Sequence, residues 1–173
     1  MQEPREGRDG PLTLRAARPD DAAAVAEIYN QGIEDRQATF QTRLHAPGEL
    51  ESKLAERDGR LIVAERDADV VGWAGFAGYD DPAEYYAGVA EVALYVRRDA
   101  RGRGIGRALL EAIAAEAARR GRYKLTAKIF TSNETSIALF RRCGWRDVGV
   151  HRRHGRLDGE WKDVLVMELL LDG

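Results

Sequence analysis

The chain is organised around the stretch from Glu91 to Ala118, which reads EVALYV, then RRDARGRGIGR, then ALLEAIAAEAA. The first part alternates between two faces, as a strand does, with apolar side chains on one of them: Val92, Leu94 and Val96. The last part is rich in alanine and leucine and carries an apolar stripe at helical spacing: Ile105, Leu109, Ala112 and Ile113. The stretch therefore predicts a strand, a turn and a helix in direct succession.

Three glycines, Gly102, Gly104 and Gly106, stand between this strand and helix. Glycine lets the backbone approach a ligand that a Cβ would keep away. The first turn of a helix has N–H groups without helical partners, and the helix dipole makes it an anion site. The same span holds five arginines: Arg97, Arg98, Arg101, Arg103 and Arg107. We expect a phosphate-bearing ligand here; the alternative is an ordinary glycine turn with solvated arginines.

Two common phosphate-binding motifs do not fit this turn. A P-loop needs Lys-Ser or Lys-Thr after its last glycine, and neither follows Gly106. A dinucleotide fingerprint needs its third glycine one residue later, where Arg107 stands. The pattern Arg101-x-x-Gly104-x-Gly106 instead resembles the acetyl-CoA pyrophosphate loop of the GNAT superfamily of N-acetyltransferases, which follows a central strand and opens a helix.

Composition and charge bound the remaining classes. A chain of 173 residues is long enough for one domain with a proper core, expected over 12–173 after a tail at 1–11. The 27 basic and 29 acidic residues give no reason to propose nucleic-acid or membrane-surface binding. The single cysteine, Cys143, excludes an internal disulfide and is interpreted as a small buried hydrophobe. With no signal peptide and no apolar run near the roughly 20 residues of a membrane span, we expect a cytoplasmic protein.

Periodicity and turn residues predict the order of the elements. Strands are expected at 12–17, 61–65, 70–77, from 84–86 up to 96, 124–130, 145–150 and 161–171. Helices are expected at 19–34, 47–57, 105–118 and 133–142, with loops at 37–46 and 151–160. The helix after the central strand allows a parallel crossover in an otherwise antiparallel meander. The expected fold is mixed α/β, with a twisted sheet of six to seven strands and about four helices.

Four segments extend the resemblance over nearly the whole chain: Ile28–Ile33, Ala38–Phe40, Arg101–Gly106 and His154–Val164. Together they are similar to the phosphinothricin/arsinothricin N-acetyltransferase family, whose members resist herbicidal glutamate mimics by acetylating their α-amino group. The resemblance implies a GNAT fold, acetyl-CoA as cosubstrate, no metal, a small amine acceptor and a homodimer. It also implies direct transfer within a ternary complex, without a covalent acyl-enzyme.

The resemblance further implies roles for individual residues. Leu94, Tyr95 and Val96 would present backbone groups to the pantetheine arm, as strand augmentation does. Asn133 would hydrogen-bond the amide region of the cofactor, beside or instead of capping the next helix. The pyrophosphate would lie on the whole glycine-rich loop: Arg101, Gly102, Arg103, Gly104, Ile105, Gly106 and Arg107.

Glu91 matches the glutamate that this family places as general base. An α-ammonium group has no lone pair, and with a pKa of about 8 it is mostly protonated at neutral pH. A carboxylate near the thioester can take that proton, directly or through water. The alternative is that Glu91 is only a charged residue on a solvent-facing strand position.

Two departures from the family pattern concern the acid and the acceptor. Many superfamily members carry a tyrosine that protonates the departing thiolate, where this chain has Phe140, which has no donor group. Tyr123 is a substitute candidate; otherwise the thiolate leaves unassisted or is protonated by water. Arginines that hold the anionic group of the substrate often precede the central strand, where this chain has Asp80 and Asp81.

These two acids would repel an anionic group if they faced the pocket. Either other arginines hold the substrate, or the substrate is less anionic. Arginine candidates are Arg36, Arg152 and Arg153. Other candidate substrate contacts are Thr39, Phe40, Tyr85 and Tyr86. The two tyrosines alternatively only pack, and Phe40 is either a pocket wall or a core plug.

Three functions are therefore compared. The leading one is an amino-acid N-acetyltransferase. The second is an acetyltransferase for a different amine, such as a polyamine, an aminoglycoside or a protein terminus, and the acidic pair at 80–81 would favour a cationic acceptor. The third is a CoA-binding sensor without catalysis, against which the presence of Glu91 argues.

Overall fold

The computed structural model describes residues 10–57 and 60–171. Most of the expected tail at 1–11, and the expected helix stop near 58–59, lie outside the described residues. The strands are β1 (Thr13–Ala16), β2 (Leu61–Arg66), β3 (Asp69–Gly78), β4 (Val89–Val96), β5 (Lys124–Phe130), β6 (Arg146–Leu157) and β7 (Glu160–Leu170). The helices are α1 (Ala22–Glu34), α2 (Gly48–Arg57), α3 (Ile105–Arg119) and α4 (Glu134–Arg142), with short 3₁₀ turns at Pro19–Asp21, Glu84–Tyr86 and Arg98–Ala100.

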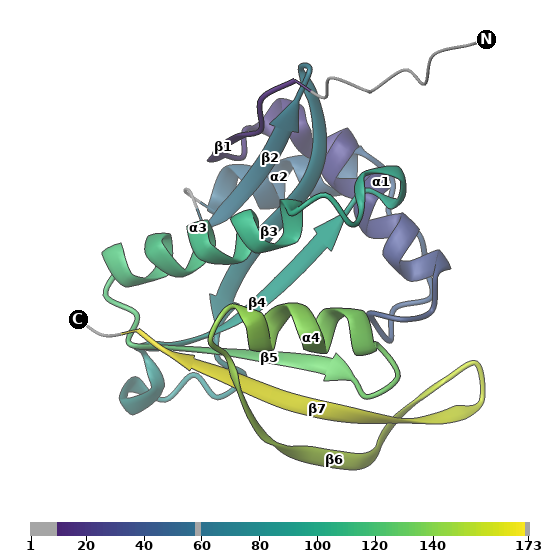
Figure 1. Ribbon diagram of the computed structural model, residues 1–173, viewed down its shortest axis with the longest axis vertical. Helices are drawn as coiled ribbons and strands as arrows, with labels where there is room; N and C mark the ends of the chain where they lie inside the picture. Colours follow the sequence, from purple (N-terminus) through teal and green to yellow (C-terminus); the bar gives the residue numbers. More distant parts are fainter. Residues whose placement is uncertain (1–9, 58–59, 172–173) are drawn as a thin grey trace, which may run out of the picture.

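The seven strands form one sheet in the order β1-β2-β3-β4-β5-β7-β6 (Figure 1). All neighbouring strands are antiparallel except β4 and β5, which α3 connects as a parallel crossover. This arrangement confirms the predicted mixed α/β sheet with four helices. Within the described ranges, no helix is both long and apolar enough to span a bilayer.

The helices cover both faces of the sheet. In Figure 1, α3 and α4 lie in front of the strands, and α1 and α2 lie behind them. The larger apolar cluster joins α3 and α4 to one face and takes Val92, Leu94 and Val96 of β4. The smaller cluster joins α1 and α2 to the other face and takes Tyr95. The alternation predicted for the central strand therefore supplies two different cores.

The predicted loop at 151–160 is wrong. β6 continues to Leu157, β7 begins at Glu160, and only Asp158 and Gly159 form the turn. Both turn residues have positive φ (50° and 84°), as in a tight two-residue hairpin. β6 is the outer strand of the sheet and is exposed along most of its length. Its sequence therefore needs no apolar alternation, which is why hydrophobic periodicity did not predict a strand at 151–157.

A second boundary differs near the central strand. Glu84–Tyr86 forms a 3₁₀ turn, and β4 begins only at Val89. Tyr123, the residue before β5, packs against Gly88, which lies directly before β4. A Cβ on Gly88 would lie 2.1 Å from the Tyr123 ring, so only glycine lets the two segments pack this closely.

β4 and β5 separate soon after they pair. Their parallel register includes only Val89–Glu91 with Lys124–Thr126. Beyond it β4 continues to Val96 and β5 to Phe130, each paired on its other edge with β3 or β7. The separation leaves one backbone edge of each strand facing the other across the middle of the sheet.

Candidate active site

A cavity of about 520 Å³ lies where β4 and β5 separate. Its walls come from both strands, from the loop before α2, from α4 and from the β6–β7 hairpin. The lining residues are Ala38–Gln41, Glu91–Tyr95, Ala127–Phe130, Asn133, Ser136, Phe140, His154, Gly155 and Val164. Elements from both halves of the chain therefore build one site.

The backbone of β4 directs hydrogen-bonding groups toward this cavity at alternate residues. The Arg97 N–H donates to the Val71 carbonyl on the β3 side (2.9 Å), whereas the Ala90 carbonyl accepts from Thr126 Oγ1 on the β5 side (3.4 Å). Backbone N–H and C=O groups alternate sides along a strand. Those of the even-numbered residues of β4 therefore point toward β5, and those of the odd-numbered residues point toward β3. The prediction for Leu94 therefore fits, whereas the backbone of Tyr95 faces β3.

Tyr95 also lines the cavity, and its ring belongs to the smaller core. The ring packs against Tyr29 and Trp73, each with 4.9 Å between ring centroids. A Cβ on Gly32 would lie 2.6 Å from this ring, so the glycine lets α1 approach β4. Burial, with a contribution from Tyr29, raises the pKa of Tyr95 far above its usual value despite the hydrogen bond with Thr39. Its hydroxyl therefore stays protonated.

The glycines of the loop after β4 have two different roles. Gly102 and Gly104 have φ of 77° and 78°, a region that strains other residues, and Gly104 caps α3. No atom lies within 4 Å of a Cβ built on either one, so the backbone there is accessible to a ligand. Gly106 is helical, and its Cβ would lie 2.8 Å from Leu139 of α4, so this third glycine serves helix packing.

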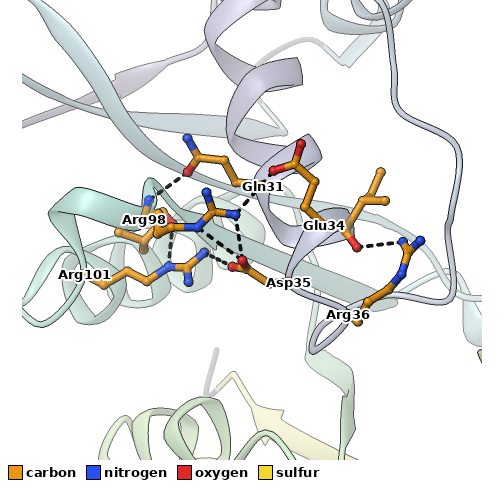
Figure 2. Close-up of polar contacts among 8 residues, drawn as sticks. Gln31, Glu34, Asp35, Arg36, Arg98 and Arg101 are labelled. Carbon is orange, nitrogen blue, oxygen red and sulfur yellow. Dashed lines mark hydrogen bonds and ion pairs between the residues drawn. The ribbon is translucent and has the colours of Figure 1, made fainter.

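Two of the loop arginines bind the C-terminal end of α1 (Figure 2). Arg98 and Arg101 place guanidinium nitrogens 2.7 and 2.8 Å from the Asp35 carboxylate. Arg101 also donates from Nε to the Val96 carbonyl (3.1 Å), and the Arg98 N–H donates to Gln31 Oε1 (2.8 Å). Burial by itself raises the pKa of Asp35, but the two guanidinium groups outweigh it and hold the pKa below its usual value.

These contacts change the interpretation of the arginine cluster. Arg107 pairs with Glu111 on its own helix (2.8 Å), and Arg97 pairs with Asp99 (2.7 Å). Cations near the C-terminal end of α1 also interact favourably with the helix dipole. At least four of the five arginines thus make ion pairs with the protein itself, which leaves the backbone amides of 102–107 as the predicted anion site.

Glu91 lines the cavity beside a lysine that sequence reasoning missed. Lys128 of β5 places Nζ 3.0 Å from Glu91 Oε2 and 2.5 Å from Asp80 Oδ2. Burial alone lowers the pKa of Lys128, but the two carboxylates outweigh it and raise the pKa above its usual value. Asp80 therefore does not face the cavity as a free negative charge. Asp81 accepts the Ala83 N–H (3.0 Å) and stabilises the local turn.

Asn133 caps α4, and Phe40 is exposed, so it is a pocket wall and not a core plug. Asn133 Oδ1 accepts the Ser136 N–H (3.2 Å), which confirms the N-cap of α4, and Nδ2 donates to the Gln37 carbonyl (3.1 Å). Its side chain also lines the cavity. Phe40 lines the cavity as well, and packs edge-to-face on Phe130 at 4.8 Å. A Cβ on Gly155 would lie 2.8 Å from the Phe40 ring, so this glycine makes room for the wall.

The arginines predicted to hold the substrate lie outside the cavity lining. Arg36 pairs with Asp158 of the hairpin turn (2.9 Å) and donates to the Ile33 carbonyl (2.9 Å; Figure 2). Arg152 and Arg153 belong to the exposed strand β6. Their assignment as substrate contacts stays a prediction that no position in the cavity supports.

The aromatic candidates divide in the same way. Tyr85 and Tyr86 are exposed, pack on each other at 4.6 Å, and do not line the cavity. Tyr123 donates its hydroxyl to the Tyr85 carbonyl (3.2 Å), also outside the cavity, so it is poorly placed as the general acid. Phe140 does line the cavity and is almost fully buried. The wall formed by α4 therefore offers an apolar ring at Phe140, beside the hydroxyl-bearing Ser136.

Two other chemistries receive no support from the described residues. Burial raises the pKa of Cys143, which keeps the thiol protonated and fits a packing role beside the main core. Within residues 10–57 and 60–171, no group of three or more His, Cys, Asp or Glu side chains is placed to hold a metal ion.

Known proteins resemble this chain in sequence and in structure. The family described as acetyltransferase (GNAT) matches residues 24–145. An L-methionine sulfoximine/L-methionine sulfone acetyltransferase of Pseudomonas paraeruginosa is 30% identical over 92% of this chain and 95% of its own. A phosphinothricin N-acetyltransferase of Alcaligenes faecalis is 31% identical over 90% of this chain and 81% of its own.

Two solved structures share the arrangement of strands and helices. A ribosomal-protein-alanine N-acetyltransferase of Brucella melitensis superposes with a TM-score of 0.87 at 34% identity, covering 92% of this chain and 99% of that one. A phosphinothricin acetyltransferase of Sinorhizobium meliloti, solved in complex with acetyl-CoA, superposes with a TM-score of 0.85 at 27% identity, covering 92% and 88%. With the family match over most of its length, the chain belongs to the GNAT family of acetyltransferases.

Proposed function

We propose that this protein transfers the acetyl group of acetyl-CoA to the α-amino group of a small amino-acid-like acceptor of the phosphinothricin, arsinothricin or methionine sulfoximine type. Such an activity would make it a resistance enzyme. The observation that carries the proposal is the cavity between β4 and β5, which has Glu91 in its wall. The names of the Pseudomonas and Alcaligenes relatives support the acceptor class.

The residues present fit acetyl-CoA. The diphosphate would accept hydrogen bonds from the amides of 102–107, where the positive φ of Gly102 and Gly104 exposes the backbone. The pantetheine arm would lie along the free edge of β4, with Leu94 offering its backbone groups. Asn133 has one amide hydrogen and one lone pair beyond its two intramolecular bonds, and these would serve the amides of the cofactor.

Glu91 would act as the general base. The acceptor enters as an ammonium ion, and the Glu91 carboxylate takes one of its protons, directly or through water. The freed nitrogen then forms its bond to the thioester carbon while the carbon–sulfur bond breaks, and the nitrogen loses its second proton to water, all within one ternary complex. Phe140 cannot donate a proton, so the leaving thiolate departs unassisted and is protonated by water.

A second acceptor class follows from one specific observation. The Brucella structure at 34% identity is named as an N-acetyltransferase for an alanine of a ribosomal protein. A peptide N-terminus presents an α-amino group but no neighbouring carboxylate. The second candidate is therefore a protein-terminus acetyltransferase that uses the same base and the same cofactor site.

Release of thiol from acetyl-CoA separates these possibilities. The wild-type protein would be assayed with L-methionine sulfoximine, phosphinothricin, an alanine-terminated peptide, a polyamine and an aminoglycoside. Turnover of the first two supports the proposal, and turnover of only the peptide or the cationic amines supports another acceptor. Binding of acetyl-CoA without release of CoA thiol in the presence of any acceptor would contradict the assignment and favour a CoA sensor.

A further inference from the structure

Two opposite charges stand side by side in the cavity wall. Glu91 of β4 and Lys128 of β5 come within 3.0 Å of each other, and both side chains are only about one-third exposed. Among the described residues that line the cavity, Lys128 is the only lysine or arginine. The arginines expected to hold an anionic group lie elsewhere, so Lys128 is the cation that an acidic substrate would meet.

We propose that Lys128 binds the carboxylate of an α-amino acid acceptor while Glu91 receives its ammonium group. This inference rests on the proposed function and narrows the acceptor to molecules that carry both charges on one carbon. Lys128 and Glu91 then form a binding site whose positive and negative charges are opposite to those of the acceptor's carboxylate and ammonium groups. Charge-assisted hydrogen bonds of this kind are stronger in a partly desolvated wall than on an open surface.

In the free protein, the Asp80 carboxylate occupies the position at Lys128 that we assign to the substrate carboxylate. Its carboxylate contacts Lys128 at 2.5 Å, and its own side chain is 73% exposed. An exposed carboxylate leaves such an ion pair at little cost, because water replaces its partner. On binding, the acceptor's ammonium replaces Lys128 at Glu91, and the acceptor's carboxylate replaces Asp80 at Lys128. Each ion pair lost is exchanged for one of the same kind.

The ion pairs also explain why Lys128 serves as an anchor. The two carboxylates raise its pKa, so it remains a cation at neutral pH, as binding a carboxylate requires. A protonated amine is a poor nucleophile. We therefore expect Lys128 to hold the acceptor and not to receive the acetyl group itself.

The test compares two acceptors that differ only at the carboxylate, L-methionine sulfoximine and its carboxamide. In Lys128→Met the KM for the acid should rise at least about tenfold, as expected for one lost hydrogen bond to a charged group. The loss of the contact between Lys128 and Glu91 affects both acceptors alike, so the readout is the ratio of the two kcat/KM values, acid over carboxamide, which should fall at least about tenfold in the same variant. Lys128→Arg keeps the charge and should restore part of the discrimination. An equal loss with both acceptors would overturn the proposal.

Lys124 provides the matched control. It lies on the same strand, is exposed to a similar extent (30% against 34%), and pairs with Glu168 outside the cavity. Lys124→Met should leave the ratio of the two kcat/KM values at the wild-type level. A change in that ratio as large as that of Lys128→Met would show that any lost lysine on β5 has this effect, and would overturn the specific role.

Asp80→Asn gives a result of opposite sign. Removing the competing carboxylate should lower the KM for the acid about two- to threefold and leave that for the carboxamide unchanged. A higher KM for the acid would contradict competition. Mass spectrometry after incubation with acetyl-CoA should find Lys128 unmodified, and complete acetylation there would overturn the anchoring role.

The outcomes also separate this inference from the proposed function. If the wild-type protein acetylates the acid and the carboxamide with equal efficiency, the acetyltransferase assignment stands and the carboxylate receptor fails. If it acetylates neither of them, nor any other amine tested, the proposed function fails first. Titration of each variant with acetyl-CoA should give the wild-type Kd, because Lys128 and Asp80 lie outside the loop at 101–107.

Discussion

The two ends of the proposed active site, the loop after β4 and the cavity beside Glu91, are built in different ways. After β4, the proposed anion site would consist of backbone amides, and Arg98 and Arg101 hold the loop against the Asp35 carboxylate. In the cavity, the site consists of two charged side chains, Glu91 of β4 and Lys128 of β5. Asp80, which follows β3, pairs with Lys128. A backbone site suits a cosubstrate that is the same for a whole family. A side-chain site can change its acceptor by single substitutions.

The difference predicts that variants at one end should affect one ligand only.

Glu91→Gln should lower kcat by about 10² to 10⁴-fold, the usual contribution of a positioned general base. The Kd for acetyl-CoA should stay within about twofold of the wild-type value, because the amide keeps the shape of the side chain. Discontinuous assays of thiol release measure kcat, and calorimetric titration measures the Kd for acetyl-CoA. Glu160→Gln, at the exposed start of β7, is the control and should keep both. An unchanged kcat in Glu91→Gln would remove Glu91 from the mechanism.

Gly104→Ala should weaken acetyl-CoA binding at least about tenfold, since its Cβ would enter the open space beside the amides. Gly121→Ala is a matched control, with φ of 74° and equally open surroundings after α3. Both variants should lose about 1–2 kcal/mol of stability from backbone strain. Only Gly104→Ala should change the Kd for acetyl-CoA, and equal changes in both would contradict a loop-specific site.

Asp35→Asn should raise the Kd for acetyl-CoA about threefold, because Arg98 and Arg101 lose the partner that fixes the loop. The KM for the acceptor should not change. Asp147→Asn breaks another carboxylate–arginine pair, with Arg141, and should leave the Kd unchanged. A Kd for Asp35→Asn equal to that of Asp147→Asn would argue against positioning by Asp35.

The same variant has a pH signature. The pKa of Asp35 is lowered in the folded state, so its carboxylate contributes stability above the unfolded pKa of about 4. That contribution, about 1 kcal/mol or less for a partly exposed pair, is lost as the pH falls through the folded-state pKa. Urea unfolding should therefore show a difference between wild type and Asp35→Asn at pH 7 that shrinks below pH of about 4.

The sequence predicted the strand, turn and helix at 91–118 well, because their signals are local. Gly102 and Gly104 adopt the left-handed conformation that the loop requires, between a strand and a helix close to those expected. Gly106 was expected to hold the diphosphate. The structure gives a different reason for a glycine there, because a Cβ would meet Leu139, a residue more than thirty positions away. The ion pairs of Arg98 and Arg101 with Asp35 likewise depend on tertiary packing that no local pattern shows.

The acceptor end was predicted only in part. Glu91, Thr39 and Phe40 do line the cavity, but Lys128 was missed because it lies in a strand predicted from apolar alternation alone. Its significance appears only when β4 and β5 pair and bring it to Glu91. The apparent conflict at Asp80 has the same cause, since its partner is distant in sequence. The correct extent of β6, which brings His154 and Gly155 to the cavity, also depended on the sheet.

A crystal structure of the protein with acetyl-CoA tests the central claim most directly. The diphosphate oxygens are expected about 2.7–3.2 Å from backbone nitrogens within 102–107, with the acetyl group in the cavity beside Glu91. A cofactor bound elsewhere, with those amides unused and the Glu91 carboxylate remote from the acetyl group, would contradict both the site and the reaction.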